Sequence, residues 1–345
     1  MYMKVLRNSL PLLGLSSILR PGGISLKMPG KSYEGKLPPL GEDAGLLHGL
    51  RRHVEKLSVE IGERNLTCFN GLKFSVEYIA EEFSKLDGEL SFQDYTVPAG
   101  SLKKHWDKYR YSYQKYQNII LEFPGREKPD DIIVIGAHYD SVPIAGCRAA
   151  NDNASGVAAV IELARYFSGL NNKRTIRFVA FANEEPPFFW TRYMGSYVYA
   201  KRCKELDENI IAMITPETIG YYSDREGSQR YPLPLKWFYP SKGNFIAFVG
   251  NSSSSNLVKN CVEIFREKEK FPCEGACLPM IVPRIGSSDH WAFWRMGYPA
   301  LMVTDTAPYR YKQYHTLSDN IDNISFDKMA RVVRGLGKVI EELAG

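Results

Sequence analysis

The stretch IIVIGAHYD at residues 132–140 decides the fold class of this chain. Its first four residues form a continuous apolar run, which is typical of a β-strand covered on both faces. Similar runs at 175–182 and 210–215 are separated by segments whose apolar residues recur at helical spacing. Strands that alternate with helices predict an α/β fold, which we expect to be a three-layer αβα sandwich with a mixed, mainly parallel central sheet.

The other elements follow from the same periodicities. We expect further strands at 90–97, 116–123, 245–250 and 300–304, and helices at 43–62, 72–87, 154–168, 195–205, 255–268, 289–296 and 326–343. Residues 221–243 contain three prolines and many aromatic residues, and they have no clear period. Because long loops in compact domains are usually functional, we interpret this excursion as a wall or lid of a binding site; a surface loop packed by its own rings is the alternative. Residues 43–345 are expected to form one domain.

Basic residues are concentrated near the N-terminus. Residues 1–40 hold six of the 44 basic residues and one of the 39 acidic residues, which leaves 38 of each in the rest of the chain. This balance argues against a nucleic-acid-binding surface, which would need a basic face on the domain itself.

Residues 1–42 are expected to be a leader and linker. Lys4 and Arg7 precede an apolar run at 10–19, which is too short for a bilayer core that needs about twenty residues. The run suits a signal-like or weakly membrane-associating segment, and an unstructured leader is the alternative. We favour an exported or membrane-associated protein over a cytoplasmic one.

The six cysteines include no CxxC pair, so no structural zinc knuckle is expected. Cys273 and Cys277 are close enough in sequence for a disulfide, which an exported protein is able to form. Two free thiols are the alternative.

The six histidines fall into two sets. His48, His53 and His105 lie in charged helix or loop context, and we expect them at the surface. Of the others, His138 stands two residues before Asp140, so both side chains point the same way from the end of a strand. Open α/β sheets bind ligands at that end, and a carboxylate beside a metal-bound imidazole fixes its orientation.

Acidic residues follow the other strands. Asp152 lies in ANDNASG at the start of a predicted helix, where it is either an N-cap or a carboxylate able to bridge two cations. Glu184 and Glu185 follow the strand at 175–182, and Glu217 follows the strand at 210–215. Buried acids are costly unless metal or solvent compensates them, so a solvated strand end is the alternative to a metal site.

His315 follows the last strand, which completes a set of groups at one end of the sheet. Asp152, Glu185 and Glu217 supply three negative charges and a bridging hydroxide a fourth, which would balance two divalent ions. We therefore expect these residues to converge on one metal site, with Glu184 left to take a proton from water.

The motifs GAHYDSV, ANDNASG, NEE, PETIGYY, SSDHWAFW and YHTLSD, in this order, resemble a known family over about residues 45–344. They resemble the aminopeptidase Y and bacterial leucyl aminopeptidase type of co-catalytic di-zinc exopeptidase, metallopeptidase family M28. The resemblance implies two Zn²⁺ ions, with Co²⁺ or Mn²⁺ as substitutes, and five ligands: His138, Asp152, Glu185, Glu217 and His315. Asp152 would bridge the two ions.

The resemblance also implies roles for neighbouring residues. Glu184 would be the general base and Asp140 would orient His138, while Asp289 and His290 would support the site without binding metal. For His290, a capping or packed side chain is the alternative. A cis peptide bond is implied between Asp152 and Asn153.

Two features depart from the family pattern. Glu217 stands where the better-known aminopeptidases often carry Asp. An insert at 186–194 separates the Glu pair from Gly195, and we expect its aromatic residues to line the specificity pocket: Phe188, Phe189, Trp190 and Tyr193.

The predicted function is hydrolysis of N-terminal residues from peptide substrates through a zinc-bridging hydroxide that Glu184 activates. One alternative is a carboxypeptidase acting on acidic C-terminal residues, for which Arg192, Arg225 or Arg230 would supply the positive charge. Others are a glutaminyl cyclase with one zinc and a non-catalytic binding domain. The preferred residue, the native metal and the oligomeric state are left open.

Overall fold

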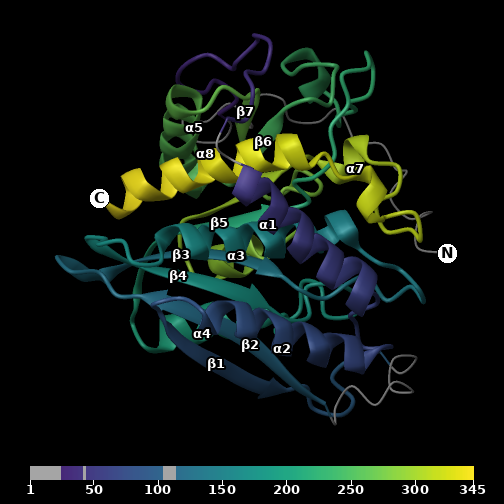
Figure 1. Cartoon of the computed structure of the whole chain (residues 1–345), viewed down its shortest axis with the longest axis vertical. Helices are drawn as coiled ribbons and strands as arrows, with labels where there is room; N and C mark the ends of the chain where they lie inside the picture. Colours follow the sequence, from purple (N-terminus) through teal and green to yellow (C-terminus); the bar gives the residue numbers. More distant parts are fainter. Residues whose placement is uncertain (1–24, 42–43, 104–113) are drawn as a thin grey trace.

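This computed structural model describes residues 25–41, 44–103 and 114–345. A mixed eight-stranded β-sheet forms the centre of the fold (Figure 1). The strand order is β1-β2-β4-β3-β5-β8-β6-β7. The strands are β1 (Glu89–Thr96), β2 (Lys115–Phe123), β3 (Lys128–His138), β4 (Arg174–Phe181), β5 (Asn209–Glu217), β6 (Ile246–Gly250), β7 (Cys273–Cys277) and β8 (Ala300–Thr304). Four pairings are parallel, namely β3 with β4 and β5, β5 with β8, and β6 with β7; the other three are antiparallel.

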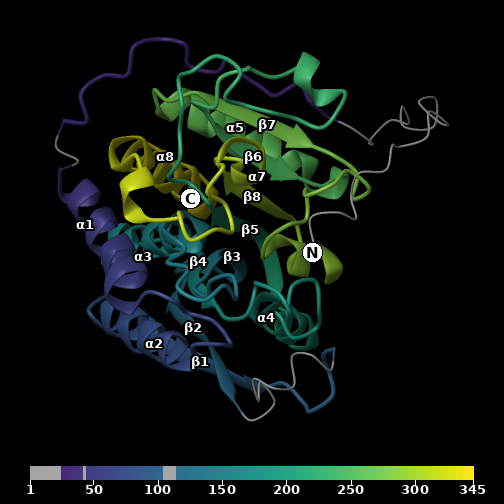
Figure 2. The ribbon, with the colours of Figure 1, turned by 90° about the vertical axis from the view of Figure 1, so that its right-hand side faces the viewer.

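Helices cover both faces of this sheet. They are α1 (Ala44–Glu55), continued by a π-helical turn at Lys56–Ile61, α2 (Phe69–Ser84), α3 (Ser155–Phe167), α4 (Gly195–Glu205), α5 (Ser255–Lys268), α6 (His290–Arg295), α7 (Ala307–Arg310) and α8 (Phe326–Ala344). Figure 2 shows α1 and α3 on one side of β3 and β4 and α4 on the other. The three-layer αβα sandwich predicted from the sequence is confirmed.

The burial of both faces of strand β3 explains why its sequence is continuously apolar and does not alternate. Ile133 and Ile135 belong to the large core beneath α1, α3, α5 and α8, whereas Ile132 and Val134 belong to the smaller core beneath α4 and α6. Because both faces are buried, every residue of the run loses contact with water, and each burial of this kind contributes about 1.5–3 kcal/mol.

The disulfide considered for Cys273 and Cys277 is ruled out. The two residues are the first and last of β7, a strand that the sequence analysis missed, and both thiols are free. Four residue steps of extended chain separate their Cα atoms by roughly 13 Å, and a disulfide needs less than about 7 Å.

His53 is buried, so its predicted surface position is wrong. It lies on the inner face of α1, where its Nδ1 is 2.6 Å from the hydroxyl of Tyr78 and its Nε2 is 2.8 Å from Glu162 Oε1. Burial lowers the pKa of the imidazole. His48, on the same helix, is exposed as predicted, and His105 lies outside the described residues.

Residues 25–41 pack against the domain although they form no helix. Ser25 pairs with Cys277 on β7, Met28 is buried, and Arg266 of α5 donates to the carbonyl oxygen of Pro29 at 2.9 Å. Residues 1–24 of the predicted leader lie outside the described residues. Within the described part of the chain, no helix has the length and apolar character needed to cross a membrane.

Candidate metal centre and adjoining pocket

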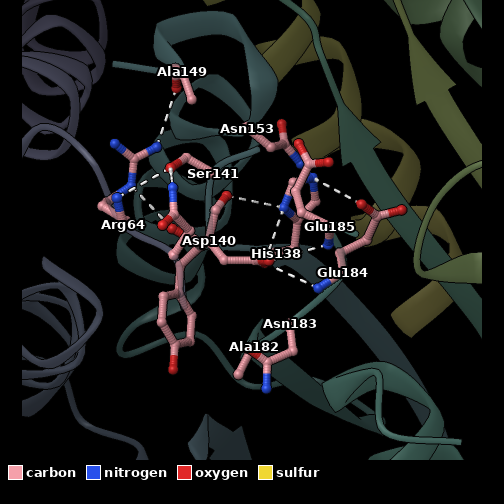
Figure 3. Close-up of polar contacts among 12 residues, drawn as sticks. Arg64, His138, Asp140, Ser141, Ala149, Asn153, Ala182, Asn183, Glu184 and Glu185 are labelled. Carbon is pink, nitrogen blue, oxygen red and sulfur yellow. Dashed lines mark hydrogen bonds and ion pairs between the residues drawn. The ribbon is translucent and has the colours of Figure 1, made fainter. Parts of the chain in front are cut away.

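The ends of four strands bring the predicted site residues together. His138 is the last residue of β3 and Glu217 the last of β5, while Glu184 and Glu185 follow β4 by three and four residues. In the parallel register, His138 stands opposite Phe181 of β4 and Glu217 opposite Thr304 of β8. The side chains therefore converge at one edge of the sheet, and Figure 3 shows His138, Glu184 and Glu185 side by side.

The imidazole of His138 is surrounded by carboxylates. Its Nε2 lies 3.2 Å from Glu217 Oε2, 3.4 Å from Asp152 Oδ1 and 3.9 Å from Glu184 Oε2. All of these side chains are buried. Like charges at this spacing repel one another, so the arrangement calls for a cation between them.

A second group lies on the other side of Asp152. His315 Nε2 is 2.9 Å from Asp152 Oδ2 and 3.3 Å from Glu185 Oε1. His138, Asp152 and Glu217 form one set of three convergent ligand atoms, and Asp152, Glu185 and His315 form another, with the atoms of each set within 4.8 Å of one another. Asp152 is common to both sets.

Three atoms of these sets make no hydrogen bond of acceptable geometry with any described residue: His138 Nε2, Asp152 Oδ2 and Glu185 Oε1. Buried polar atoms are almost always satisfied, because leaving one without a partner costs about 1–3 kcal/mol. Imidazole nitrogen and carboxylate oxygen are the ligands that zinc and similar divalent metals take. The residues present therefore fit a metal centre.

Asp140 contacts more residues of the site than was predicted from the sequence. Its Oδ1 lies 3.3 Å from His138 Nδ1, consistent with the expected orienting role. In addition, Oδ1 and Oδ2 accept hydrogen bonds from the backbone N–H groups of Glu184 and Glu185, each at 3.0 Å (Figure 3). One carboxylate thus positions both the imidazole and the Glu pair.

Further polar contacts, missed by the sequence analysis, hold the carboxylates. Ser288 Oγ donates to Glu217 Oε2 at 2.8 Å, and Asn153 Nδ2 donates to the same oxygen at 3.2 Å. Asp319 Oδ2 accepts from the backbone N–H of Asp152 at 3.1 Å. The polar character of SSDHWAFW and YHTLSD was the available signal, but it did not reveal these partners.

The start of α3 approaches β5 closely. A Cβ atom at Gly156 would lie 2.3 Å from the carbonyl oxygen of Pro216, so a residue with a side chain would push helix and strand apart. This approach sets Asp152 beside Glu217. The peptide bond between Asp152 and Asn153 is cis, in agreement with the family resemblance.

Burial is the largest influence on the pKa values of the acids at the site. It raises the pKa of Glu184 well above its ordinary value and that of Glu217 to about 8. For Asp152, burial acts in the same direction, but interactions with His138 and His315 outweigh it and hold the pKa below its ordinary value. Asp152 is thus the acid most strongly kept ionised.

Asp289 and His290 are both buried, but they lie in different surroundings. Burial raises the pKa of Asp289 to about 7, and the nearby His138 acts in the opposite direction. His290 Nε2 lies 2.6 Å from the carbonyl oxygen of Ile285, and its ring packs edge-on against Trp294 at 4.5 Å. The packed alternative therefore describes His290 better than a supporting role at the metals.

An apolar pocket adjoins the metal centre. Its wall includes Glu217 and Tyr314 at the site, and it extends over β8, β6 and β7 beneath the 221–243 loop. Tyr314 stacks on His315 with ring centroids 3.9 Å apart. The 221–243 loop thus contributes a pocket wall, and Tyr231, Leu235 and Tyr239 are among the residues that line it.

The aromatic insert is not in that wall. Phe188 is only 1% exposed and packs edge-on against Tyr116 in the core, so its predicted place in the pocket is wrong. Phe189 and Trp190 stack on each other, and Trp190 Nε1 donates to the carbonyl oxygen of Gly286. Tyr193 donates to Ser101. The first ring of the insert is therefore buried, the stacked pair Phe189 and Trp190 lies beside Gly286, and Tyr193 lies beside Ser101.

Comparisons with known proteins agree with this site. A model of peptidase family M28 matches residues 118–340. The chain is 36% identical over 294 residues to the uncharacterized protein YfbL of Escherichia coli, which covers 83% of this chain and 85% of that protein. It is 26% identical over 314 residues to leucine aminopeptidase 1 of Fusarium vanettenii, which covers 83% of this chain and 70% of that protein.

Solved structures share the fold. BSAP, a zinc aminopeptidase from Bacillus subtilis, superposes with a TM-score of 0.66 at 18% identity, over 86% of this chain and 94% of that chain. The glutaminyl cyclase of Fimbriiglobus ruber superposes with a TM-score of 0.62 at 21% identity, over 91% and 99%.

The fold and the paired His and carboxylate groups define a metallopeptidase-type α/β protein. Because the family model matches well over half of its length, the chain belongs to peptidase family M28. The family predicted from the motifs is confirmed, and with it the class of enzyme, a hydrolase of peptide bonds.

Proposed function

We propose that this chain is a zinc-dependent aminopeptidase that removes N-terminal residues from peptides. The observation that carries the proposal is the pair of three-residue groups sharing Asp152, with buried atoms that lack hydrogen-bond partners among the described residues. The name of the Fusarium relative, leucine aminopeptidase 1, supports the same activity.

The convergent side chains support the following proposal for the metal ligands. His138, Asp152 and Glu217 would hold one zinc ion, and Asp152, Glu185 and His315 the other. Bound zinc supplies a Lewis acid that polarises a peptide carbonyl and lowers the pKa of water. Asp152 is suited to the shared position because it presents one oxygen to each group, Oδ1 towards His138 and Oδ2 towards His315.

Glu184 is the residue that we assign to proton transfer. It belongs to neither group of three, yet its Oε2 lies 3.9 Å from His138 Nε2. The carboxylate is buried, and burial raises its pKa. A carboxylate tuned in this direction is able to take a proton from the attacking water and return it to the leaving amine.

The adjoining pocket favours the aminopeptidase over the carboxypeptidase alternative. Its wall is mainly apolar, and among the described residues it contains one cation, Arg284, but not Arg192, Arg225 or Arg230. Recognition of an acidic C-terminal residue would use charge-assisted hydrogen bonds from such cations. An apolar side chain of the first substrate residue fits this wall better.

The experiment is metal analysis of the purified protein together with a panel of aminoacyl, N-acetylated and C-terminally varied peptides. We expect two zinc ions per chain and cleavage of the peptides with a free N-terminus. A Glu184→Gln variant should retain zinc and lose at least about 100-fold in turnover. The matched control is Glu127→Gln, an exposed acid immediately before β3. Full activity of Glu184→Gln would refute the assignment.

Glutaminyl cyclase is the second candidate, because the Fimbriiglobus enzyme shares the fold over 91% of this chain. The same panel separates the two activities when it includes peptides that begin with glutamine. A cyclase releases ammonia and leaves the peptide bonds intact, whereas an aminopeptidase releases free glutamine.

A further inference from the structure

The most exposed apolar side chains are gathered on two loops. Among the large apolar residues in the described part of the chain, the four most exposed are Ile281 at 79%, Trp237 at 70%, Leu233 at 64% and Phe238 at 61%. Three belong to residues 231–239 of the excursion, and Ile281 belongs to residues 278–286. Exposed apolar residues scattered singly need no explanation, but this concentration indicates a contact surface.

The two loops, which we call the loop pair, lie against each other. Leu235 and Tyr239 pack in one small cluster with Val282 and Ile285. Tyr239 also donates its hydroxyl proton to the carbonyl oxygen of Gly275 on β7 at 2.8 Å. The inner side chains thus fix the loops to the sheet, while the four exposed side chains project from them.

The first described residues, Ser25 and Leu26, lie beside the loop pair. Ser25 exchanges two backbone hydrogen bonds with Cys277, each of 2.9 Å, and Leu26 packs in the same cluster as Leu235 and Val282. Figures 1 and 2 both place the purple start of the described chain at the same end of the molecule as the excursion. The first described residues are therefore fixed next to the loop pair.

The charges on this surface have one sign. Residues 231–239 and 278–286 contain no acid, and they carry Lys236, 5.5 Å above the ring of Trp237, and the exposed Arg284. Two copies of the chain meeting through this surface would bring like charges together, which disfavours self-association.

We propose that the loop pair docks on a membrane surface that contains anionic lipids. Aromatic rings and aliphatic tips enter the boundary between head groups and acyl chains, while Lys and Arg contact the lipid phosphates. Because the loop pair also forms the wall of the pocket beside Glu217, docking holds the candidate metal centre close to the bilayer. The proposal does not depend on which peptide bond is cleaved.

The test is co-sedimentation of the full chain with phosphatidylcholine vesicles, with and without phosphatidylglycerol. We expect binding to the anionic vesicles that weakens as salt is raised. A triple variant, Trp237→Ser with Phe238→Ser and Ile281→Ser, should bind at least about tenfold more weakly. The matched control, Phe74→Ser with Leu170→Ser and Leu206→Ser, replaces three exposed apolar residues elsewhere and should bind within about twofold of the unmodified chain.

Charge is tested separately with Lys236→Glu, which should reduce the preference for anionic vesicles, whereas Lys73→Glu on α2 should not. Circular dichroism and the melting temperature establish that each variant is folded. The proposal is overturned if the triple variant binds as well as the unmodified chain, if neither vesicle is bound, or if sedimentation shows a dimer that the triple variant dissociates.

Discussion

Asp140 accepts a hydrogen bond from the backbone N–H of Glu184, at 3.0 Å. The same carboxylate accepts the next N–H, that of Glu185, and also lies beside His138. A residue that binds no metal in our assignment therefore sets the positions of the proposed proton-transfer group and of two proposed ligands.

Replacing Asp140 by Asn tests this relationship. Asparagine offers one acceptor oxygen where two N–H groups need partners, so the backbone at Glu184 and Glu185 should shift. We expect metal affinity and turnover each to fall by about 10–100-fold. Titration with a zinc indicator and steady-state kinetics measure the two effects. The control is Asp131→Asn at the opposite end of β3, and equal effects of the two substitutions would contradict the assigned role.

A substitution in the floor of the pocket should change the substrate preference. Ala247 of β6 is buried and lines the pocket, so Ala247→Leu would fill space that a large substrate side chain needs. We expect kcat/KM to fall by roughly tenfold for substrates beginning with Leu or Phe and to change little for those beginning with Ala. A uniform loss across these substrates would show that the pocket does not receive the first residue.

Removing the metal should change the sign of the pH dependence of stability. Burial raises the pKa of Glu217 from 4.5 to about 8, so its contribution to stability is complete below pH 4.5 and is lost as the pH rises through 8. Although burial opposes it, the acids around His315, with Glu185 first, raise the pKa of that residue from 6.5 to about 11, so its contribution is also lost as the pH rises.

We therefore expect the chelated protein to lose on the order of 1–3 kcal/mol of stability between about pH 6 and about pH 9. The zinc-loaded protein should show the opposite trend, because metal binding requires deprotonated ligands. Melting temperatures in chelator and in zinc at the two pH values provide the measurement. A chelated protein with a higher melting temperature at the upper pH would contradict this prediction.

The buried His53 should serve stability and not catalysis. His53→Ala leaves Glu162 and the hydroxyl of Tyr78 without their imidazole partner, which should cost about 1–3 kcal/mol in the free energy of unfolding. Denaturant unfolding of this variant is compared with that of His48→Ala, an exposed change on the same helix that should stay within about 0.5 kcal/mol. Equal stability of the two variants would show that the buried contacts contribute nothing.

Strands that are buried on both faces were predictable because a continuous apolar run in the sequence indicates such burial directly. Each residue of the run at 132–135 faces one of two cores, so the run is apolar throughout. Strand β7 was missed because its five residues, CEGAC, include a glycine and an acid and show no alternation. It is held by pairing with β6, which no local pattern reports.

The site residues were predictable for a related reason. Parallel strands end at one edge of a sheet, so polar residues that follow them must meet. What the sequence did not reveal are the contacts that depend on exact packing between distant segments, such as Ser288 with Glu217. His53 and Phe188 were misplaced because a polar residue was assumed to face water and an aromatic insert to face the substrate.

In the proposed metal centre, two metal ions share Asp152. Zinc content of the purified protein, combined with anomalous diffraction at the zinc edge, tests it most directly. We expect two sites, one among His138, Asp152 and Glu217 and the other among Asp152, Glu185 and His315. A single site, or full peptidase activity in protein that contains no metal, would contradict it.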